Sequence, residues 1–148
     1  MRPLIKAGLL ATLLLTSAAW AQTTSPIGLW KTIDDESGKP KALVRITEEN
    51  GALQGKIEKL FRGPNEDQNP KCVECKDSRK DQPLIGLTIV SGLKKDGNEY
   101  TGGEILDPAK GKVYKSKATL RDGGQKLEVR GYIGAPMFGR SQVWQREQ

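Results

Sequence analysis

The amino-acid sequence from residue 27 onward predicts a mainly β domain, folded as an eight-stranded antiparallel up-and-down barrel. Short segments of alternating apolar and polar residues follow one another, and Gly, Asn, Asp and Pro separate them. Asn50-Gly51 is a strong hairpin signal, and no amphipathic helix longer than about two turns is found. Closing the meander would remove exposed strand edges. A sandwich of two sheets is the competing architecture.

Each expected strand has one apolar face. In the fourth strand, Leu87, Ile89, Ser91 and Leu93 are expected to share a face, and Gly102-Gly103 in the fifth predicts a bulge or a close backbone approach. Between the third and fourth strands, residues 62–83 break the alternation and form the longest expected loop. The expected strands cover residues 27–33, 41–47, 53–57, 87–93, 99–106, 112–120, 126–133 and 140–146.

The first 21 residues have the pattern of a signal peptide. Arg2 and Lys6 precede a short apolar run, and Ala19-Trp20-Ala21 has the small-x-small pattern of a cleavage site. We therefore expect cleavage near Ala21, a single domain over residues 22–148, and a periplasmic or secreted location. An uncleaved N-terminal anchor is the alternative.

Charge and composition exclude several classes of function. The chain has 24 Lys and Arg against 18 Asp and Glu, a net charge of +6, and no histidine. Without histidine there is no Ser-His-Asp or Cys-His catalysis, and the commonest ligand of transition metals is missing. We expect no catalytic residues, no metal and no cofactor. We also expect no nucleic-acid partner, because the export signal would remove the protein from nucleic acid. The basic charge leaves open a peripheral contact with anionic envelope surfaces.

Gly28-Leu29-Trp30 opens the first expected strand and resembles the start of calycin barrels, the lipocalin group. In that group the Trp closes one end of the barrel and an arginine from near the last strand packs across it. Arg140 and Arg146 are the candidates here, and Arg140 is assigned to this closure together with Gly28 and Trp30. A cation–π contact of this kind contributes roughly 0.5–2 kcal/mol.

A wider set of motifs resembles the bacterial family called domain of unknown function 2147. The resemblance covers essentially all of the chain after the signal peptide and implies a small exported lipocalin-like barrel with no agreed activity. It brings no catalytic residues. The motifs are the initial Gly28-Leu29-Trp30, Pro83-Leu84-Ile85-Gly86-Leu87, Gly103-x-Ile105-x-Asp107-Pro108-x-x-Gly111-Lys112-x-Tyr114, Gly131-Tyr132-Ile133-Gly134 and Phe138-Gly139-Arg140-x-Gln142-x-Trp144.

Cys72 and Cys75 lie in the long loop and are expected to form a disulfide, as nearby cysteines do in oxidising compartments. A redox-active pair and a metal site are the alternatives. Redox activity is favoured by a thiol of low pKa at a helix N-terminus, and this charged, Pro-rich loop predicts no helix there. Two thiolates without further ligands are too few for a zinc site.

The function that these features favour is non-enzymatic binding of a small apolar or amphipathic molecule inside the barrel. An envelope interaction module with a filled barrel and a thiol–disulfide redox protein are the alternatives. Residues on the apolar strand faces are expected to line the ligand site: Val44, Ile57, Ile89, Ile105, Tyr114, Leu127 and Val129.

Overall fold

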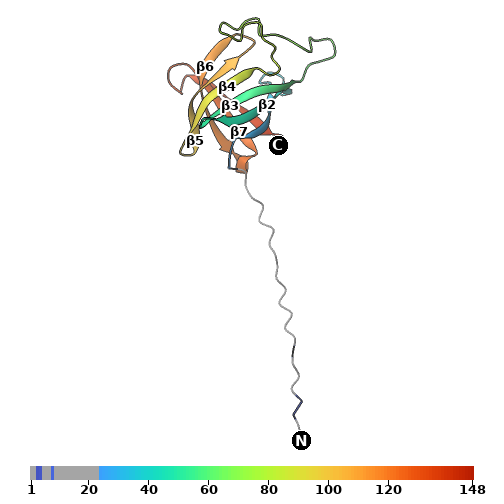
Figure 1. Cartoon of the computed structure of the whole chain (residues 1–148), viewed down its shortest axis with the longest axis vertical. Coiled ribbons are helices and arrows are strands. Elements are labelled where there is room, and N and C mark those ends of the chain that lie inside the picture. The colour runs from blue at the N-terminus through green and yellow to red at the C-terminus, as the bar shows by residue number, and fades with distance from the viewer. Residues whose placement is uncertain (1–2, 5–7, 9–23) are drawn as a thin grey trace.

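The computed structural model describes residues 3–4, 8 and 24–148, and its strands form one closed barrel (Figure 1). The predicted signal peptide, residues 1–21, falls almost entirely outside the described residues. No helix among the described residues is long and apolar enough to cross a membrane. The eight strands are β1 (Gly28–Ile33), β2 (Pro40–Glu49), β3 (Ala52–Leu60), β4 (Thr88–Asp96), β5 (Glu99–Asp107), β6 (Lys112–Arg121), β7 (Lys126–Tyr132) and β8 (Gly139–Arg146), with a short 3-10 turn η1 (Asp122–Gly124) before β7.

The strands form an up-and-down meander in which every strand pairs antiparallel with its neighbours in sequence. The ring closes between β1 and β8, where Trp30 faces Arg146 and Lys31 faces Gln145. Backbone hydrogen bonds from Leu29 N to Gln148 O at 3.1 Å and from Glu147 N to Leu29 O at 2.8 Å extend this seam. The predicted closed barrel is therefore confirmed, and its first and last strands are joined to each other at this seam.

The inward faces follow the predicted alternation along most strands. Ala42, Val44 and Ile46 of β2 are buried, as are Leu127 and Val129 of β7. This pattern arises because successive side chains of a strand point to opposite sides of the sheet.

The apolar face predicted for the fourth strand is wrong at Ser91. Ser91 is exposed and its neighbour Val90 is buried instead. The register between β3 and β4 shifts near Gly55, and Gly92 adopts a φ of +73°. This irregularity exchanges the two faces within β4, as a bulge does.

The bulge predicted at Gly102-Gly103 is present, since the register between β5 and β6 shifts between Tyr100 and Gly103. Gly103 is also a close approach, because a Cβ there would lie 2.7 Å from the Leu93 side chain and from the Ser91 carbonyl oxygen.

The two ends of the barrel are built differently. The connections at residues 50–51, 97–98 and 122–125 lie at one end, which we call the closed end. The other end, the mouth, carries the longer connections at residues 34–39, 61–87, 108–111 and 133–138. Figure 1 shows the longest of these, between β3 and β4, spread over that end of the barrel.

Candidate functional site

Trp30 and Arg146 plug the closed end. The Trp30 indole is fully buried, and its Nε1 donates a hydrogen bond to the Pro26 carbonyl at 2.7 Å. The Arg146 guanidinium lies 4.3 Å from the centre of the Trp30 ring, which is cation–π distance. It also donates hydrogen bonds to the carbonyls of Ser25 at 2.6 Å and Gly124 at 2.7 Å. Partial burial lowers the pKa of Arg146, but a guanidinium remains charged at any physiological pH.

The prediction that Arg140 packs across Trp30 is wrong, because Arg140 lies at the opposite end. Arg140 and Arg146 belong to the same face of β8, which starts at the mouth and finishes at the closed end. Trp30 sits near the start of β1, and the antiparallel register places it opposite Arg146. At the mouth, Arg140 Nη2 lies 2.6 Å from Asp35 Oδ2.

Gly28 lies directly under this plug. Its φ of +144° is in a region that side-chain-bearing residues rarely adopt, and a Cβ there would lie 2.6 Å from Arg146 Nη1. Gly28 therefore makes room for the guanidinium. Arg146 could have been predicted from the expected topology, because closing an antiparallel barrel pairs the start of the first strand with the end of the last strand.

Between the plug and the mouth, the barrel holds a cavity of about 1120 Å³. Its walls come from all eight strands, and its opening is bordered by the four connections of the mouth. The barrel is therefore open toward the mouth and filled by its own side chains toward the closed end.

Six of the seven residues predicted to line a ligand site do line this cavity: Val44, Ile57, Ile89, Ile105, Tyr114 and Val129. Leu127 does not. It lies at the start of β7, next to the closed end, where it pairs with Leu120 and Trp144 and is buried in the core below the cavity. Alternation predicts that a side chain points inward, but its distance from the mouth decides whether it meets open space or the plug.

Sequence reasoning missed several wall residues. Trp144 is buried and lines the cavity, and its Nε1 donates to Gln142 Oε1 at 3.2 Å. Thr32 and Leu60 also contribute to the wall. The alternation of side chains along β8 would have predicted Gln142 and Trp144 as wall residues, because both share the inward face with Arg146.

The loop between β3 and β4, residues 61–87, forms a folded flap at the mouth. Cys72 and Cys75 are joined by the predicted disulfide, and both are buried. The Cys72 backbone donates to Gln82 O and accepts from Asp81 N, both at 2.8 Å. The loop that sequence patterns left without structure is thus held by its own hydrogen bonds and by the disulfide.

The flap packs against the connection between β5 and β6. Gly111 has a φ of +65°, and a Cβ at this position would overlap the Glu74 carbonyl. Cys72 Sγ also lies 3.8 Å from the Pro108 carbonyl oxygen. The backbone of Gly111 therefore contacts the backbone of the flap directly, and no side chain fits at residue 111.

Among the side chains that line the cavity, six cations stand against four carboxylates. Arg62 and Arg140 are paired, with Glu66 at 3.8 Å and Asp35 at 2.6 Å respectively. Four lysines that line the cavity form no ion pair within the described residues: Lys39, Lys41, Lys71 and Lys110.

Two of the carboxylates at the mouth are engaged by backbone amides. Asp34 Oδ1 accepts hydrogen bonds from the N–H groups of Ser37 at 2.8 Å and Glu36 at 2.9 Å, and the Ser37 bonds lower the pKa of Asp34. Asp107 Oδ1 accepts from Ala109 N at 3.0 Å. These carboxylates stabilise turns, whereas the four lysines have no such partner.

Fold and cavity together define a lipocalin-like barrel, plugged at one end and open at the other. A solved structure, protein HP1028 from Helicobacter pylori, described as belonging to the lipocalin family, superposes with a TM-score of 0.71 at 19% identity over 85% of each chain. At that identity the likeness shows the fold alone. Residues 28–146 match the family described as "Uncharacterized protein conserved in bacteria (DUF2147)", and the chain belongs to this family. No curated protein matches the chain.

Proposed function

We propose that this protein is a non-enzymatic, exported binding protein for a small amphipathic molecule. The apolar part of the ligand occupies the barrel, and an anionic group stays at the mouth. The observation that carries the proposal is the cavity of about 1120 Å³, because ligand sites typically measure about 300–1,000 Å³. The signal-peptide pattern of residues 1–21, Arg2 and Lys6 ahead of an apolar run and Ala19-Trp20-Ala21, is what supports an exported, periplasmic location.

The shape of the cavity favours entry of an apolar chain through the mouth. Trp30 and Arg146 block the closed end, and Val44, Ile57 and Val129 are among the apolar wall residues. Burying one methylene group stabilises a complex by about 0.8 kcal/mol. A chain that extends toward Trp144 would therefore gain affinity with each carbon until the cavity is full.

The lysines of the mouth favour an anionic group on the ligand. Lys71 lies on the flap and Lys110 on the connection that the flap contacts, and both line the cavity without an ion pair among the described residues. An exposed ion pair contributes about 0.2–1 kcal/mol. This electrostatic contribution is smaller than that of the apolar chain. The lysines therefore orient the ligand, and the apolar chain supplies most of the affinity.

The same geometry argues against the two alternatives drawn from the sequence. A filled barrel is incompatible with the open cavity. A redox role is disfavoured because Cys72 and Cys75 are each about 1% exposed, and a catalytic thiol must be reached by its partner.

Native mass spectrometry of protein isolated from its own periplasm is the first test. We expect a co-purified amphiphile, which solvent extraction would release for identification. Delipidated protein should then bind straight-chain fatty acids with an affinity that rises about fourfold per added methylene and levels off at the length that fills the cavity. Affinity that does not depend on chain length would contradict the proposal.

Matched variants distinguish the effect of a residue in the cavity wall from that of a residue on the outer surface. Val129→Trp narrows the cavity and should shift the best-bound fatty acid to a shorter chain, whereas Val143→Trp on the outer face of β8 should not. Lys71→Gln with Lys110→Gln should weaken carboxylate binding by up to about fivefold for each lysine and leave alcohol binding unchanged. Lys94→Gln, near the closed end of β4, is the charge control.

A further inference from the structure

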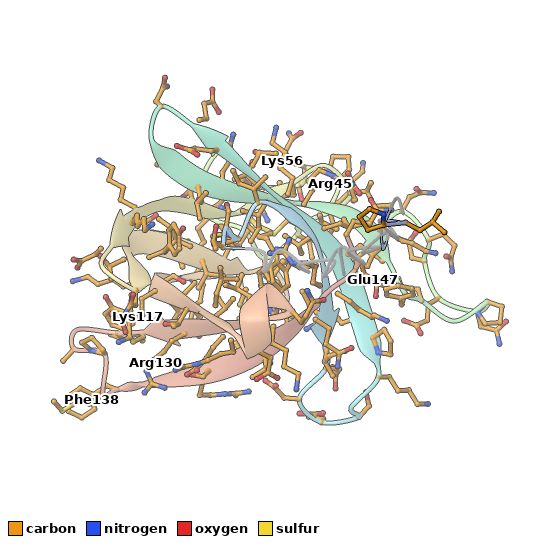
Figure 2. The ribbon with its side chains drawn as sticks, turned by 90° about the horizontal axis from the view of Figure 1, so that it is seen from below. Arg45, Lys56, Lys117, Arg130, Phe138 and Glu147 are labelled. Atoms are coloured by element: carbon orange, nitrogen blue, oxygen red, sulfur yellow. A yellow bond between two sulfur atoms is a disulfide. The ribbon has the colours of Figure 1, made fainter. Side chains whose placement is uncertain are left out.

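The connection between β7 and β8 carries three large apolar side chains into solvent. Ile133, Met137 and Phe138 are 59%, 76% and 69% exposed, and we call them the apolar tip. Figure 2 shows Phe138 at the outer end of the hairpin that carries Arg130. Apolar side chains gathered in one exposed turn of a monomer are uncommon enough to indicate an interaction site.

The apolar tip is held in place by hydrogen bonds. Ile133 N donates to Phe138 O at 3.2 Å, and Phe138 N donates to Ala135 O at 3.0 Å. The Arg130 guanidinium donates to the Pro136 carbonyl at 2.6 Å and the Gly139 carbonyl at 3.2 Å.

Gly139 closes the base of this hairpin, because a Cβ there would lie 2.6 Å from the Tyr132 Cβ. The turn is therefore preorganised. Its apolar side chains are exposed because the folded turn holds them in solvent.

The tip belongs to the mouth of the barrel. Ile133 and Phe138 line the cavity opening, and so do Phe61 and Val73 of the flap, which are also exposed. Arg140 follows the tip directly, with a side chain that is 76% exposed. The apolar side chains thus lie on the same end of the molecule as the unpaired lysines described above.

The geometry points to docking of the mouth on an anionic lipid surface, with Ile133, Met137 and Phe138 inserted among the acyl chains near the headgroups. Apolar side chains flanked by Lys and Arg are what such an interface accommodates, because the cations meet lipid phosphates while the apolar groups leave water. Of the net charge of +6, Arg2 and Lys6 of the expected signal peptide supply two charges, and the remaining +4 (6 − 2) on residues 22–148 is complementary to an anionic membrane. Docking in this orientation would bring the cavity opening to the membrane.

A protein partner or a second copy fits this patch less well. A stable protein interface buries about 1,200–2,000 Å² in total, and the side chains of one narrow hairpin supply only a small part of that. Membrane insertion has no such requirement, since each apolar side chain that leaves water contributes independently. The inference does not depend on whether the cavity holds a ligand.

Flotation with phospholipid vesicles tests it on the exported chain with its disulfide intact. We expect binding to vesicles that contain phosphatidylglycerol, weaker binding to pure phosphatidylcholine, and loss of binding at high salt. Phe138→Ser and Met137→Ser should each lower the partition coefficient about tenfold. Val143→Ser, a 47% exposed apolar residue on the outer wall, should bind like the wild type.

A Phe138→Trp variant gives a direct readout at the tip. It should keep vesicle binding, and its added emission should shift to the blue and be quenched by brominated lipids. Equal binding by Phe138→Ser and wild-type protein would overturn the proposal. So would tip-dependent dimers in sedimentation without vesicle binding, which would assign the patch to a second copy.

Discussion

Arg140 and Arg146 form a matched pair of arginines on one face of one strand, and replacing each by Met tests how the barrel is closed. Both variants lose the same charge and keep a long apolar side chain. Arg146 stacks 4.3 Å from the Trp30 ring and binds backbone carbonyls of Ser25 and Gly124. Arg140 is exposed and pairs with Asp35.

The expected magnitudes differ clearly. A cation–π contact contributes about 0.5–2 kcal/mol, and charged hydrogen bonds add about 1.5–3 kcal/mol. Because these terms are not additive and the site is only partly buried, we expect Arg146→Met to lower the free energy of unfolding by about 3 kcal/mol. Arg140→Met removes one exposed ion pair and should cost at most about 1 kcal/mol.

Urea unfolding followed by tryptophan fluorescence and far-ultraviolet circular dichroism measures both variants. The midpoint should fall for Arg146→Met with little change in the slope, because the unfolded chain exposes similar surface. In a thermal melt its Tm should drop by about 12 °C, at roughly 4 °C per kcal/mol for a domain of this size. An equal or larger loss for Arg140→Met would refute the assignment of Arg146 as the plug.

Two further predictions concern the flap. Gly111→Ala should push the flap away from the β5–β6 connection, because its Cβ would overlap the Glu74 carbonyl, and hydrogen exchange in residues 62–83 should rise while the barrel amides keep their protection. The hydrogen bonds from Arg79 hold the pKa of Asp77 at about 2, below the 3.8 of an ordinary Asp side chain. A lowered folded-state pKa means that this contact stabilises the flap fully above pH 3.8 and is lost as the pH falls through about 2. Flap protection should decline in that window in the wild type, and an identical decline in Asp77→Asn would contradict the reasoning.

The flap is anchored both by its disulfide and by non-covalent contacts. Its disulfide spans a short ring, which contributes roughly 2 kcal/mol in the chain-entropy model. The burial of Cys72 and Cys75 against the core adds to this local anchoring. We therefore interpret the cysteines as a device that shapes one side of the mouth rather than one that holds the barrel together.

Local sequence determined the strand content and the closed meander. Alternation with a period of two residues depends only on neighbours along the chain, and so do hairpin signals such as Asn50-Gly51. From these alone, the barrel and six of the seven proposed wall residues could be predicted. The position of Gly28 and Trp30 at the start of the first strand also pointed correctly to the plug.

Tertiary structure decided the features that depend on residues far apart in the sequence. The register between β1 and β8 selected Arg146 over Arg140, and depth below the mouth placed Leu127 in the core rather than in the cavity wall. The bulge near Gly92 exchanged Val90 for Ser91. Whether eight strands enclose a filled core or an open cavity depends on the summed volume of all inward side chains against the barrel radius, and no local pattern contains that sum.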